Sequence, residues 1–390
     1  VFTAVKEVVR NCDGKRGSEA MSDEEEAFQR SDDGDLKAPT LIATDYLEIA
    51  VLAVVLCIGV PLNAVVLRKL LRLYSTGVTL SRAKQDETRI GFLMLQIHLT
   101  IVDLIFIILY CPSKLIWLIC YVWPFGAFLC KAVQYSWMFA HHSMSFAIVS
   151  IAIDRVKTVH DLMAMRERGR MAPPKSKIRC IKRMIVLTYL GAAIFSLPQW
   201  LAWTTADLVS WSQCTTIWHK QRAIDFLNGN EYTYFFYWEQ MYTIVHLTTM
   251  FWGPFLVLFL SYACITFSLF LYSFSSPQET TELHRINADD RSSSAKPDSF
   301  TSHERLSSIE ASAAAPVRSW RVEMRARMCH TSAIVILAYL LCWLPYNLIS
   351  LAMFFSKGLS VSLSIHFDIV RVFVIFNTFL NPFIYGFRNS

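Results

Sequence analysis

Ile148-Val-Ser-Ile-Ala-Ile-Asp-Arg-Val156 closes a long apolar stretch with an acid and a base side by side. The whole stretch, about Ala127–Ile153, is long enough as a helix to cross the hydrocarbon core of a bilayer, which takes about 20 residues. Charged side chains are costly inside that core, so Asp154 and Arg155 are expected where the helix meets water. The stretch predicts a membrane-spanning helix with a charged end.

The composition places the chain among membrane proteins. Its 390 residues are 54% apolar and 17% charged, with a mean hydropathy of +0.36, whereas a soluble domain carries about 25% charged residues. Seven stretches have the length and apolar character of a spanning helix. They are about Tyr46–Leu67, Gly91–Cys111, Ala127–Ile153, Met184–Trp203, Tyr242–Tyr272, Thr331–Phe355 and Ile365–Phe387. We therefore expect an all-α membrane protein, a bundle of seven transmembrane helices.

The Lys and Arg residues between the spans determine the expected orientation. The first, third and fifth connecting segments are basic, and the third carries Lys and Arg throughout residues 157–183. Basic segments face the cytoplasm under the positive-inside rule, which puts the N-terminus outside and the C-terminus in the cytoplasm. We expect a multi-pass protein of the plasma membrane. The net charge of +6 reflects this topology, and no nucleic acid is expected as a partner because no binding fold surrounds the basic segments.

Two polar regions lie outside the spans. Residues 1–44 are acidic and lack the apolar core of a cleavable signal peptide, and we expect a disordered extracellular tail. Residues 273–319 are rich in Ser and Ala and are expected as a disordered third cytoplasmic loop. This loop separates helices one to five (45–272) from helices six and seven with a very short C-terminus (320–390). Its serines are candidates for phosphorylation, and a linker without a role explains them equally well.

Two cysteines are placed by this topology on the oxidising side of the membrane, where a disulfide persists. Cys130 opens the third span, and Cys214 lies in the second outer loop. A bridge between them would tie that loop over the top of the third span. Cys12 and Cys120 are also outside or near it, so the count of cysteines does not force the pairing.

Asp103 lies in the middle of the second span, in Leu99-Thr-Ile-Val-Asp-Leu104. A carboxylate at that depth is costly unless it is paired or hydrated, so it is a candidate functional group. Asn63, Asn377 and Asn381 lie at similar depth in the first and seventh spans. We expect a hydrated polar cluster among these three spans. Hydrogen bonds that only hold helices together are the alternative explanation.

Prolines interrupt several spans, and each can kink its helix because it lacks an N–H group. They are Pro61, Pro198, Pro254, Pro345 and Pro382. Single kinks are common in membrane helices, so the order of the kinks and their neighbours carries the information.

Taken together, these features resemble a rhodopsin-like (class A) G-protein-coupled receptor. Seven spans, the acid in span two, the outer cysteines and the Asp–Arg pair agree with that family. So do Pro254 followed by Tyr262 in span five, Cys342-Trp-Leu-Pro-Tyr346 in span six and Asn381-Pro-Phe-Ile-Tyr385 in span seven. The resemblance covers about Tyr46–Asn389. It implies a receptor and not an enzyme, with an extracellular ligand, a heterotrimeric G protein and the bilayer as partners.

Shorter matches are similar to the receptors for gonadotropin-releasing hormone and the related adipokinetic hormones. They are Leu80-Ser-Arg82 in a long first inner loop, Ile97-His-Leu-Thr-Ile-Val-Asp103 and Ser212-Gln-Cys-Thr-Thr216. This resemblance implies a neuropeptide hormone as the ligand. It also implies a G protein of the phospholipase C and calcium-coupled type.

Some positions depart from the superfamily pattern. The Asp–Arg pair is followed by Val156 where an aromatic residue is more frequent. Met144 and Ser145 stand where a Ser for an ion site and an apolar switch residue are frequent, and Tyr339 stands where a Phe is usual. These changes count against a Na⁺ ion near Asp103, the one cofactor that the resemblance suggests.

The resemblance implies a ligand cavity among the outer halves of spans two to seven, where aromatic anchors and a few polar groups suit a peptide. In this cavity Trp137 takes a place where relatives carry a Lys, and Lys114 one where they carry an acid. The expected lining residues are Lys114, Gln134, Trp137, Met138, Tyr346, Asn347, His366, Asp368 and Arg371. Arg371 lies within a span and needs a partner, either Asp368 or an acceptor on the ligand.

Signalling would follow from a shift in population between two bundle geometries. The expected switch residues are Asp103, Asn63, Trp343, Pro345, Asn377, Asn381, Pro382, Tyr385 and Tyr262. The residues expected at the G-protein interface are Asp154, Arg155, Arg325 and Arg327. Asp154 would neutralise Arg155 at rest, and movement of span six would release it.

Other classes of function remain open at this point. The adjacent His141 and His142 point in different directions on a helix, so no metal site is expected. A transporter that uses Asp103 and Arg371 as a polar pathway is the first alternative, although such proteins often contain repeated halves and none is visible here. A receptor for another peptide or a small ligand, or a seven-helix protein that no longer signals, are the others.

Overall fold

The computed structural model describes residues 43–80, 87–120, 122–168, 174–208, 211–227, 237–274, 302–355 and 367–386. His366 lies outside these ranges. The backbones of Arg325, Arg327, Asp368 and Tyr385 belong to described helices, but their side chains are outside the description. The expected positions of these five side chains therefore stay predictions.

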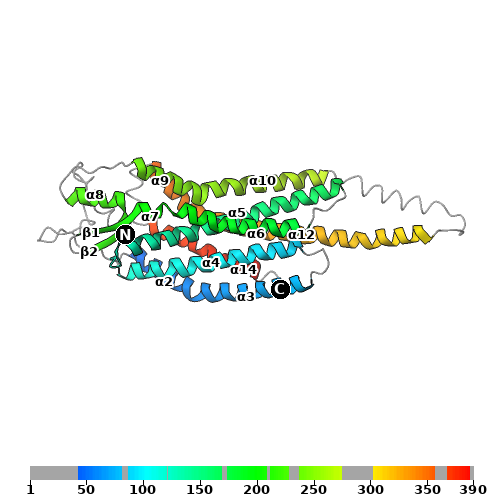
Figure 1. Ribbon diagram of the computed structural model, residues 1–390, viewed down its shortest axis with the longest axis horizontal. Helices are drawn as coiled ribbons and strands as arrows, with labels where there is room; N and C mark the ends of the chain where they lie inside the picture. Colours follow the sequence, from blue (N-terminus) through cyan, green and yellow to red (C-terminus); the bar gives the residue numbers. More distant parts are fainter. Residues whose placement is uncertain are drawn as a thin grey trace.

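Long helices lie side by side along the longest axis of the molecule (Figure 1). The first is continuous over α2 (Ala43–Val54), η3 (Val55–Gly59) and α3 (Val60–Leu80). The next are α4 (Glu87–Cys120), α5 (Gly126–Arg168) and α6 (Pro174–Ser196), which is followed by the short α7 (Gln199–Ala202). The remaining helices are α8 (Ile217–Leu227), the continuous α9 (Tyr237–Leu247), η4 (Thr248–Trp252) and α10 (Gly253–Phe274), then α12 (Ser302–Phe355) and α14 (Phe367–Gly386).

Within the described residues, six helices are long and apolar enough to cross a membrane, and Val370–Ile384 is a shorter apolar helix. These seven correspond to the seven expected spans, and the prediction of a helical membrane bundle is confirmed. Most of the helices are longer than their apolar stretches. For example, α5 continues to Arg168, because helical hydrogen bonds do not stop where the bilayer does.

Two spans contain a short π-helical turn before a proline. The turn η3 (Val55–Gly59) precedes Pro61, and η4 (Thr248–Trp252) precedes Pro254. Such a turn accommodates a residue that cannot donate the next backbone hydrogen bond. Pro382 lies inside α14. Pro112 lies inside α4 and was not among the prolines expected to kink a helix.

Pro198 interrupts the fourth span, as expected. Helix α6 ends at Ser196 and Pro198 caps the start of α7, so the apolar span continues across the proline to Ala202. The expected end at Trp203 lies one residue further, where a strand begins. A proline that follows a helix end ends the helix because it cannot donate to the preceding turn.

A two-stranded antiparallel hairpin follows the fourth span. It consists of β1 (Trp203–Leu208) and β2 (Trp211–Thr216), and Thr205 is the register partner of Cys214. The disulfide Cys130–Cys214 joins β2 to the first turn of α5, with 5.5 Å between the Cα atoms. The predicted pairing is thus confirmed, and it leaves Cys120 as a free thiol.

Helix α12 starts much earlier than the sequence suggested. It begins at Ser302 and runs for 54 residues, so its first turns occupy part of segment 273–319, where an unstructured loop was expected. Residues 275–301 of that segment lie outside the description. The Ala-rich stretch Ala311-Ser-Ala-Ala-Ala315 favours a helix, since Ala has the highest helix propensity. Figure 1 shows this yellow part of α12 extending past the other helices.

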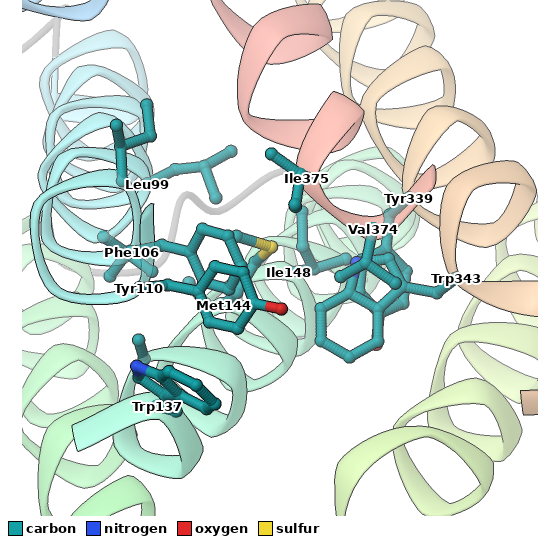
Figure 2. Packing of buried hydrophobic residues seen from close by; sticks show 14 of the residues in the cluster. Leu99, Phe106, Tyr110, Trp137, Met144, Ile148, Tyr339, Trp343, Val374 and Ile375 are labelled. Atoms are coloured by element: carbon teal, nitrogen blue, oxygen red, sulfur yellow. The ribbon is translucent and has the colours of Figure 1, made fainter. Parts of the chain in front are cut away.

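Helix α5 forms the centre of the bundle. Ala140, Met144, Ile148 and Ala152, which follow one another at intervals of four residues, are all 0% exposed. Figure 2 shows Met144 and Ile148 among side chains from α4, α12 and α14. Large apolar side chains such as Leu201 point outward and are exposed, as expected for helices whose outer solvent is lipid. The core is therefore built around the helix that carries Asp154 and Arg155.

Candidate functional site

Aromatic rings fill the bundle below the hairpin. The ring of Trp137 on α5 lies 4.9 Å from Tyr110 and 5.7 Å from Trp117 between centroids. His141, one turn further along α5, lies 4.9 Å from Phe106 and 5.6 Å from Trp343. These rings connect α4, α5 and α12 and are called the aromatic floor below; Figure 2 labels Phe106, Tyr110, Trp137 and Trp343 among them.

The hairpin closes over this floor through polar contacts. The indole nitrogen of Trp117 donates to the Oε1 atom of Gln213 at 2.9 Å. The backbone N–H of Trp123 donates to the carbonyl of Ser212 at 2.8 Å, and the Ser212 hydroxyl donates back to the Trp123 carbonyl at 2.6 Å. Because these contacts and the disulfide act on the same strand, β2 is held against the bundle at three points.

Polar groups of the expected lining set lie beside the aromatic floor. Trp137 donates its indole N–H to the Ser113 hydroxyl at 2.7 Å. Asn347 donates to the carbonyl of Trp343 at 2.9 Å, and its Oδ1 atom makes no hydrogen bond within the described residues. The Nε2 atom of Gln134 is likewise buried without a protein acceptor in the described part of the chain. Two buried polar atoms thus have no partner within the described residues, while Met138 packs against the core.

Lys114 is paired inside the protein. Its Nζ atom lies 3.6 Å from Oε1 of Glu48 on α2, and both side chains are buried. The sequence analysis missed Glu48, although an acid inside the apolar stretch that begins at Tyr46 is a signal of the same kind as Asp103. This ion pair joins the first span to the second.

Arg371 lies over an aromatic ring. Its guanidinium carbon is 5.8 Å from the ring centroid of Tyr346, within the range of a cation–π contact. The contact brings together two expected lining residues from α14 and α12. The pairing of Arg371 with Asp368 stays a prediction, since the Asp368 side chain lies outside the description.

The polar cluster expected in mid-membrane is present in the described side chains. Asn381 donates from Nδ2 to both carboxylate oxygens of Asp103, at 3.2 and 3.1 Å. Asn63 donates to the carbonyls of Gly59 and Thr378 at 2.9 and 3.2 Å. These bonds join α3 and α4 to α14, so the three expected spans meet there.

Next to this cluster, Asn377 donates to the sulfur of Met144 at 3.2 Å. A thioether is a soft ligand, and hard cations prefer oxygen. The Na⁺ ion near Asp103 stays a prediction, and Met144 offers it no oxygen.

A second polar link surrounds the Pro254 kink. Pro254 has no N–H to donate to the carbonyl of Met250, four residues earlier. The Ser145 hydroxyl donates to that carbonyl at 2.8 Å and lies 2.9 Å from the hydroxyl of Tyr339. Tyr339 in turn packs on Trp343, with ring centroids 5.1 Å apart. Ser145 thus connects the kinked fifth span to the sixth span and to the aromatic floor.

Further along α5, Arg155 is 0% exposed and forms an ion pair with Asp154. Its guanidinium carbon lies 4.5 Å from the ring centroid of Phe92 on α4. Two of its nitrogens, Nε and Nη1, have no hydrogen-bond partner among the described residues, and neither has the Tyr262 hydroxyl. The arrangement holds a charged guanidinium inside the bundle with hydrogen-bond donors unused.

The chain can be compared with known proteins on this basis. The family described as "7 transmembrane receptor (rhodopsin family)" matches residues 76–385, which covers most of the bundle. The chain belongs to this family. It is a multi-pass receptor of the plasma membrane, and the family is one of signalling receptors rather than enzymes.

Three individual proteins similar to the receptor share 23–28% of its residues in the matched regions. It is 28% identical to the G-protein coupled receptor daf-38 of Caenorhabditis elegans, over 95% of this chain and 94% of the nematode protein. It is 26% identical to the gonadotropin-releasing hormone receptor of Octopus vulgaris, over 79% of this chain and 65% of the octopus protein. It is 23% identical to the vasopressin V1b receptor of Mus musculus, over 80% of this chain and 68% of the mouse protein.

The receptor brings most of the predicted residues together in two groups. The outer group surrounds the aromatic floor, and the inner group extends from Asp103 to Arg155. Glu48, the rings of Tyr110, Trp117 and Trp123, and the contact of Gln213 were not among the expected site features. Their signal was weak because Trp and Tyr residues are frequent in this chain and their spacing does not show which ones meet.

Proposed function

We propose that this receptor binds an extracellular peptide hormone of the gonadotropin-releasing or adipokinetic hormone type and activates a heterotrimeric G protein. The hormone receptors among its relatives support this proposal. The floor of stacked Trp, Tyr and His rings with unused polar atoms also supports it, since aromatic anchors and a few polar groups suit peptide recognition. The expected G protein is of the phospholipase C and calcium-coupled type.

Two residues of the expected hormone pocket already make contacts within the protein. Lys114 is occupied by Glu48, and Trp137 is bonded to Ser113. The buried amide atoms Gln134 Nε2 and Asn347 Oδ1 have no hydrogen-bond partner within the described residues, and Tyr346 offers a ring surface beside Arg371. We propose that a peptide with an amidated end and aromatic side chains meets these groups, because amide and ring surfaces complement them.

One observation carries the signalling part of the proposal. Arg155 is buried beside Asp154 and has two nitrogens without a partner in the described residues. A buried charge with unused hydrogen-bond donors is costly, and a second state in which those donors find partners would relieve that cost. Displacement of α12 would expose Arg155 to a G-protein segment, with Tyr262 stabilising the open state and Arg325 and Arg327 beside it. The hormone would favour this state only if it binds it more tightly.

A panel of short amidated neuropeptides tests the proposal in cells that express the receptor. We expect one peptide class to evoke a calcium signal, and we expect Arg155→Ala to abolish that signal with peptide binding retained. A calcium response that persists in Arg155→Ala would contradict the signalling mechanism. Binding without any nucleotide exchange on a purified G protein would instead identify a receptor that no longer signals.

A receptor of the same family for another ligand is the second candidate. Lys114 and Trp137 differ in character from the residues expected at these places in hormone receptors of the gonadotropin-releasing hormone type, and this difference favours it. The same panel, extended to small amines and lipids, separates the two. The transporter hypothesis is not supported, because the chain belongs to a receptor family.

A further inference from the structure

A cavity of about 340 Å³ lies between α5 and α10, outside the pocket and the polar cluster. Helix α5 contributes Ile153, Val156, Lys157 and His160, and Val159 completes its side. Helix α10 contributes Ser261, Cys264, Ile265 and Ser268. Each helix provides positions i, i+3, i+4 and i+7, which form one stripe on a helix surface. The cavity is therefore a furrow between two parallel helix faces.

The α5 stripe faces away from the signalling residue. Successive residues of a helix are about 100° apart, so the stripe is centred roughly 150° from Arg155. Arg155 itself is buried against Phe92 of α4, whereas Ile153 is 44% exposed. Next to the α10 stripe, Leu260 and Phe267 are exposed large apolar residues. Such surface belongs to the lipid side of a membrane helix, so the cavity opens toward the bilayer.

The depth of the cavity follows from the apolar stretches of the two helices. The apolar stretch of α5 closes at Ile153, directly before Asp154 and Arg155, and that of α10 runs to about Tyr272. Lys157 and His160 thus lie about one and two turns beyond the end of the first stretch, and Ser268 lies about one turn before the end of the second. Ile153 and Ser261 lie about two turns deeper, at 1.5 Å rise per residue. The cavity has an apolar inner part and a basic, hydroxyl-bearing mouth at the level of the lipid head groups.

This end of the bundle is the basic end, with Arg179, Lys182 and Arg183 exposed on the neighbouring α6. The positive-inside rule assigns it to the cytoplasmic leaflet, which contains anionic lipids. Basic pockets between transmembrane helices on that side suit anionic head groups. The occupant must be both anionic and apolar, because a basic mouth leads into an apolar furrow.

We propose that this cavity is a binding site for an anionic phospholipid of the cytoplasmic leaflet. The lipid phosphate lies at Lys157 and His160, within reach of the Ser268 hydroxyl. One acyl chain lies along Ile153, Val156 and Ile265. The site is independent of the hormone pocket and does not rest on the identity of the hormone. Its effect would be to fix the spacing between α5 and α10, next to Tyr262.

Native mass spectrometry of the purified receptor tests the proposal, with equimolar phosphatidylserine and phosphatidylcholine as probes. We expect the receptor to retain phosphatidylserine preferentially. The variant Lys157→Gln/His160→Gln should lose most of this preference. Loss of the lysine alone should reduce the preference about fivefold, which is the factor expected for one basic group at an anionic surface. The variant Lys182→Gln/Arg183→Gln removes two exposed basic residues outside the cavity and should keep the preference.

Two further measurements locate the lipid. A photoactivatable phosphatidylserine should crosslink to peptides that contain residues 153–160 and 261–268. Ile153→Trp, at a half-exposed lipid-facing position, should obstruct the furrow and reduce this crosslinking without disturbing the core. Equal loss of preference in both charge variants, or crosslinks confined to α6, would overturn the proposal.

A G-protein segment is the other conceivable occupant, and the charge variants distinguish it. If the cavity receives the G protein, Lys157→Gln/His160→Gln reduces nucleotide exchange in nanodiscs of pure phosphatidylcholine, where no anionic lipid is present. That result, with unchanged phosphatidylserine retention, would also overturn the proposal. A lipid site instead predicts that the variant and the unmodified receptor differ only when phosphatidylserine is present.

Discussion

Ser145 has a single hydroxyl proton and lies within hydrogen-bond distance of two oxygens, the Met250 carbonyl and the Tyr339 hydroxyl. Ser145 donates this proton to the Met250 carbonyl. Pro254 cannot donate to that carbonyl because proline has no N–H group. The bond between Ser145 and Tyr339 must then be donated by the tyrosine. Because Pro254 leaves the Met250 carbonyl without a donor, Ser145 donates to that carbonyl and Tyr339 donates to Ser145. Both hydroxyl protons of this buried pair are therefore hydrogen-bonded.

Removing members of this pair should have unequal effects. Tyr339→Phe removes one donor and should cost about 1 kcal/mol of unfolding free energy. Ser145→Ala leaves both a buried carbonyl and a buried hydroxyl unpaired, at about 1–3 kcal/mol each, so it should cost more. The double variant should be less destabilised than the sum of the two. Thermal unfolding of the purified receptor measures these differences.

Ser136→Ala provides the control for this series, because the Ser136 hydroxyl donates only to the Ala132 carbonyl of its own helix turn among the bonds described for it. It should have little effect. An additive double variant would show that Ser145 and Tyr339 do not act as a pair.

The ion pair of Glu48 and Lys114 leads to a second residue-scale prediction. Both side chains are buried, and breaking such a pair by removing one partner costs about 3–5 kcal/mol. Lys114→Ala should therefore lower the unfolding temperature strongly. Replacing both residues by apolar ones of similar size, Glu48→Leu/Lys114→Met, should restore much of the loss.

Unfolding midpoints of the three forms measure this effect. If the double replacement were as unstable as Lys114→Ala, the pair would not be the source of the stability. Peptide binding to the double variant would then show whether Lys114 has a second role toward the ligand.

At the scale of elements, the outer hairpin is held by contacts from three directions. The disulfide joins it to α5, the Ser212–Trp123 hydrogen bond joins it to the loop between α4 and α5, and Lys220 of α8 donates to the Thr205 carbonyl of β1 at 2.9 Å. The strands themselves form only a two-stranded ribbon, which is marginal on its own in water. The shape of the hairpin therefore depends on these attachments.

Removal of the disulfide should loosen the hairpin. Cys214→Ser should cost about 2–5 kcal/mol of stability, the usual cost of losing a native disulfide in a small extracellular domain, and should weaken peptide binding. Cys120→Ser is the matched control, since Cys120 is a free, exposed cysteine on the same side. Hydrogen exchange of residues 203–216 would report the loosening, and unchanged protection in Cys214→Ser would contradict this account.

At the scale of the whole molecule, two groups of residues lie about four turns apart along α5. Trp137 and His141 of the aromatic floor form the first group, and Asp154 and Arg155 form the second. Between them, Ser145 and Met144 contact η4, α12 and α14. A change at one end is therefore transmitted through side chains that touch three helices, provided that the two states of the bundle differ in these contacts.

The balance between these states should respond to Asp154. Asp154→Asn removes the counter-charge that holds Arg155 but keeps the side-chain volume. We expect basal nucleotide exchange to rise about tenfold, because a charge-assisted hydrogen bond contributes about 1.5–3 kcal/mol to the resting state. Exchange on a purified G protein without hormone measures this. Unchanged basal exchange would show that the pair does not hold the resting state.

Local patterns predicted much of this architecture. Apolar length predicted the seven spans, and the positions of Cys130 and Cys214 predicted their bridge. The ends of helices were less predictable. Trp203 was expected as the last residue of the fourth span and begins a strand, because it pairs with Thr216 of β2. Ser302 was expected in an unstructured segment and begins a helix, because local helix propensity acts beyond the membrane.

The sequence by itself determined that this chain crosses the membrane, in which order its polar residues enter the bundle and to which receptor family they point. These properties depend on apolar length and on residue order, which are local. Only the tertiary structure decided that Lys114 faces Glu48 and that Ser145 donates to the Met250 carbonyl, which lacks a donor because of Pro254. The same holds for the cavity between α5 and α10 beside Lys157. Each of these depends on which helix faces meet, and that is decided by side-chain packing between segments far apart in the chain.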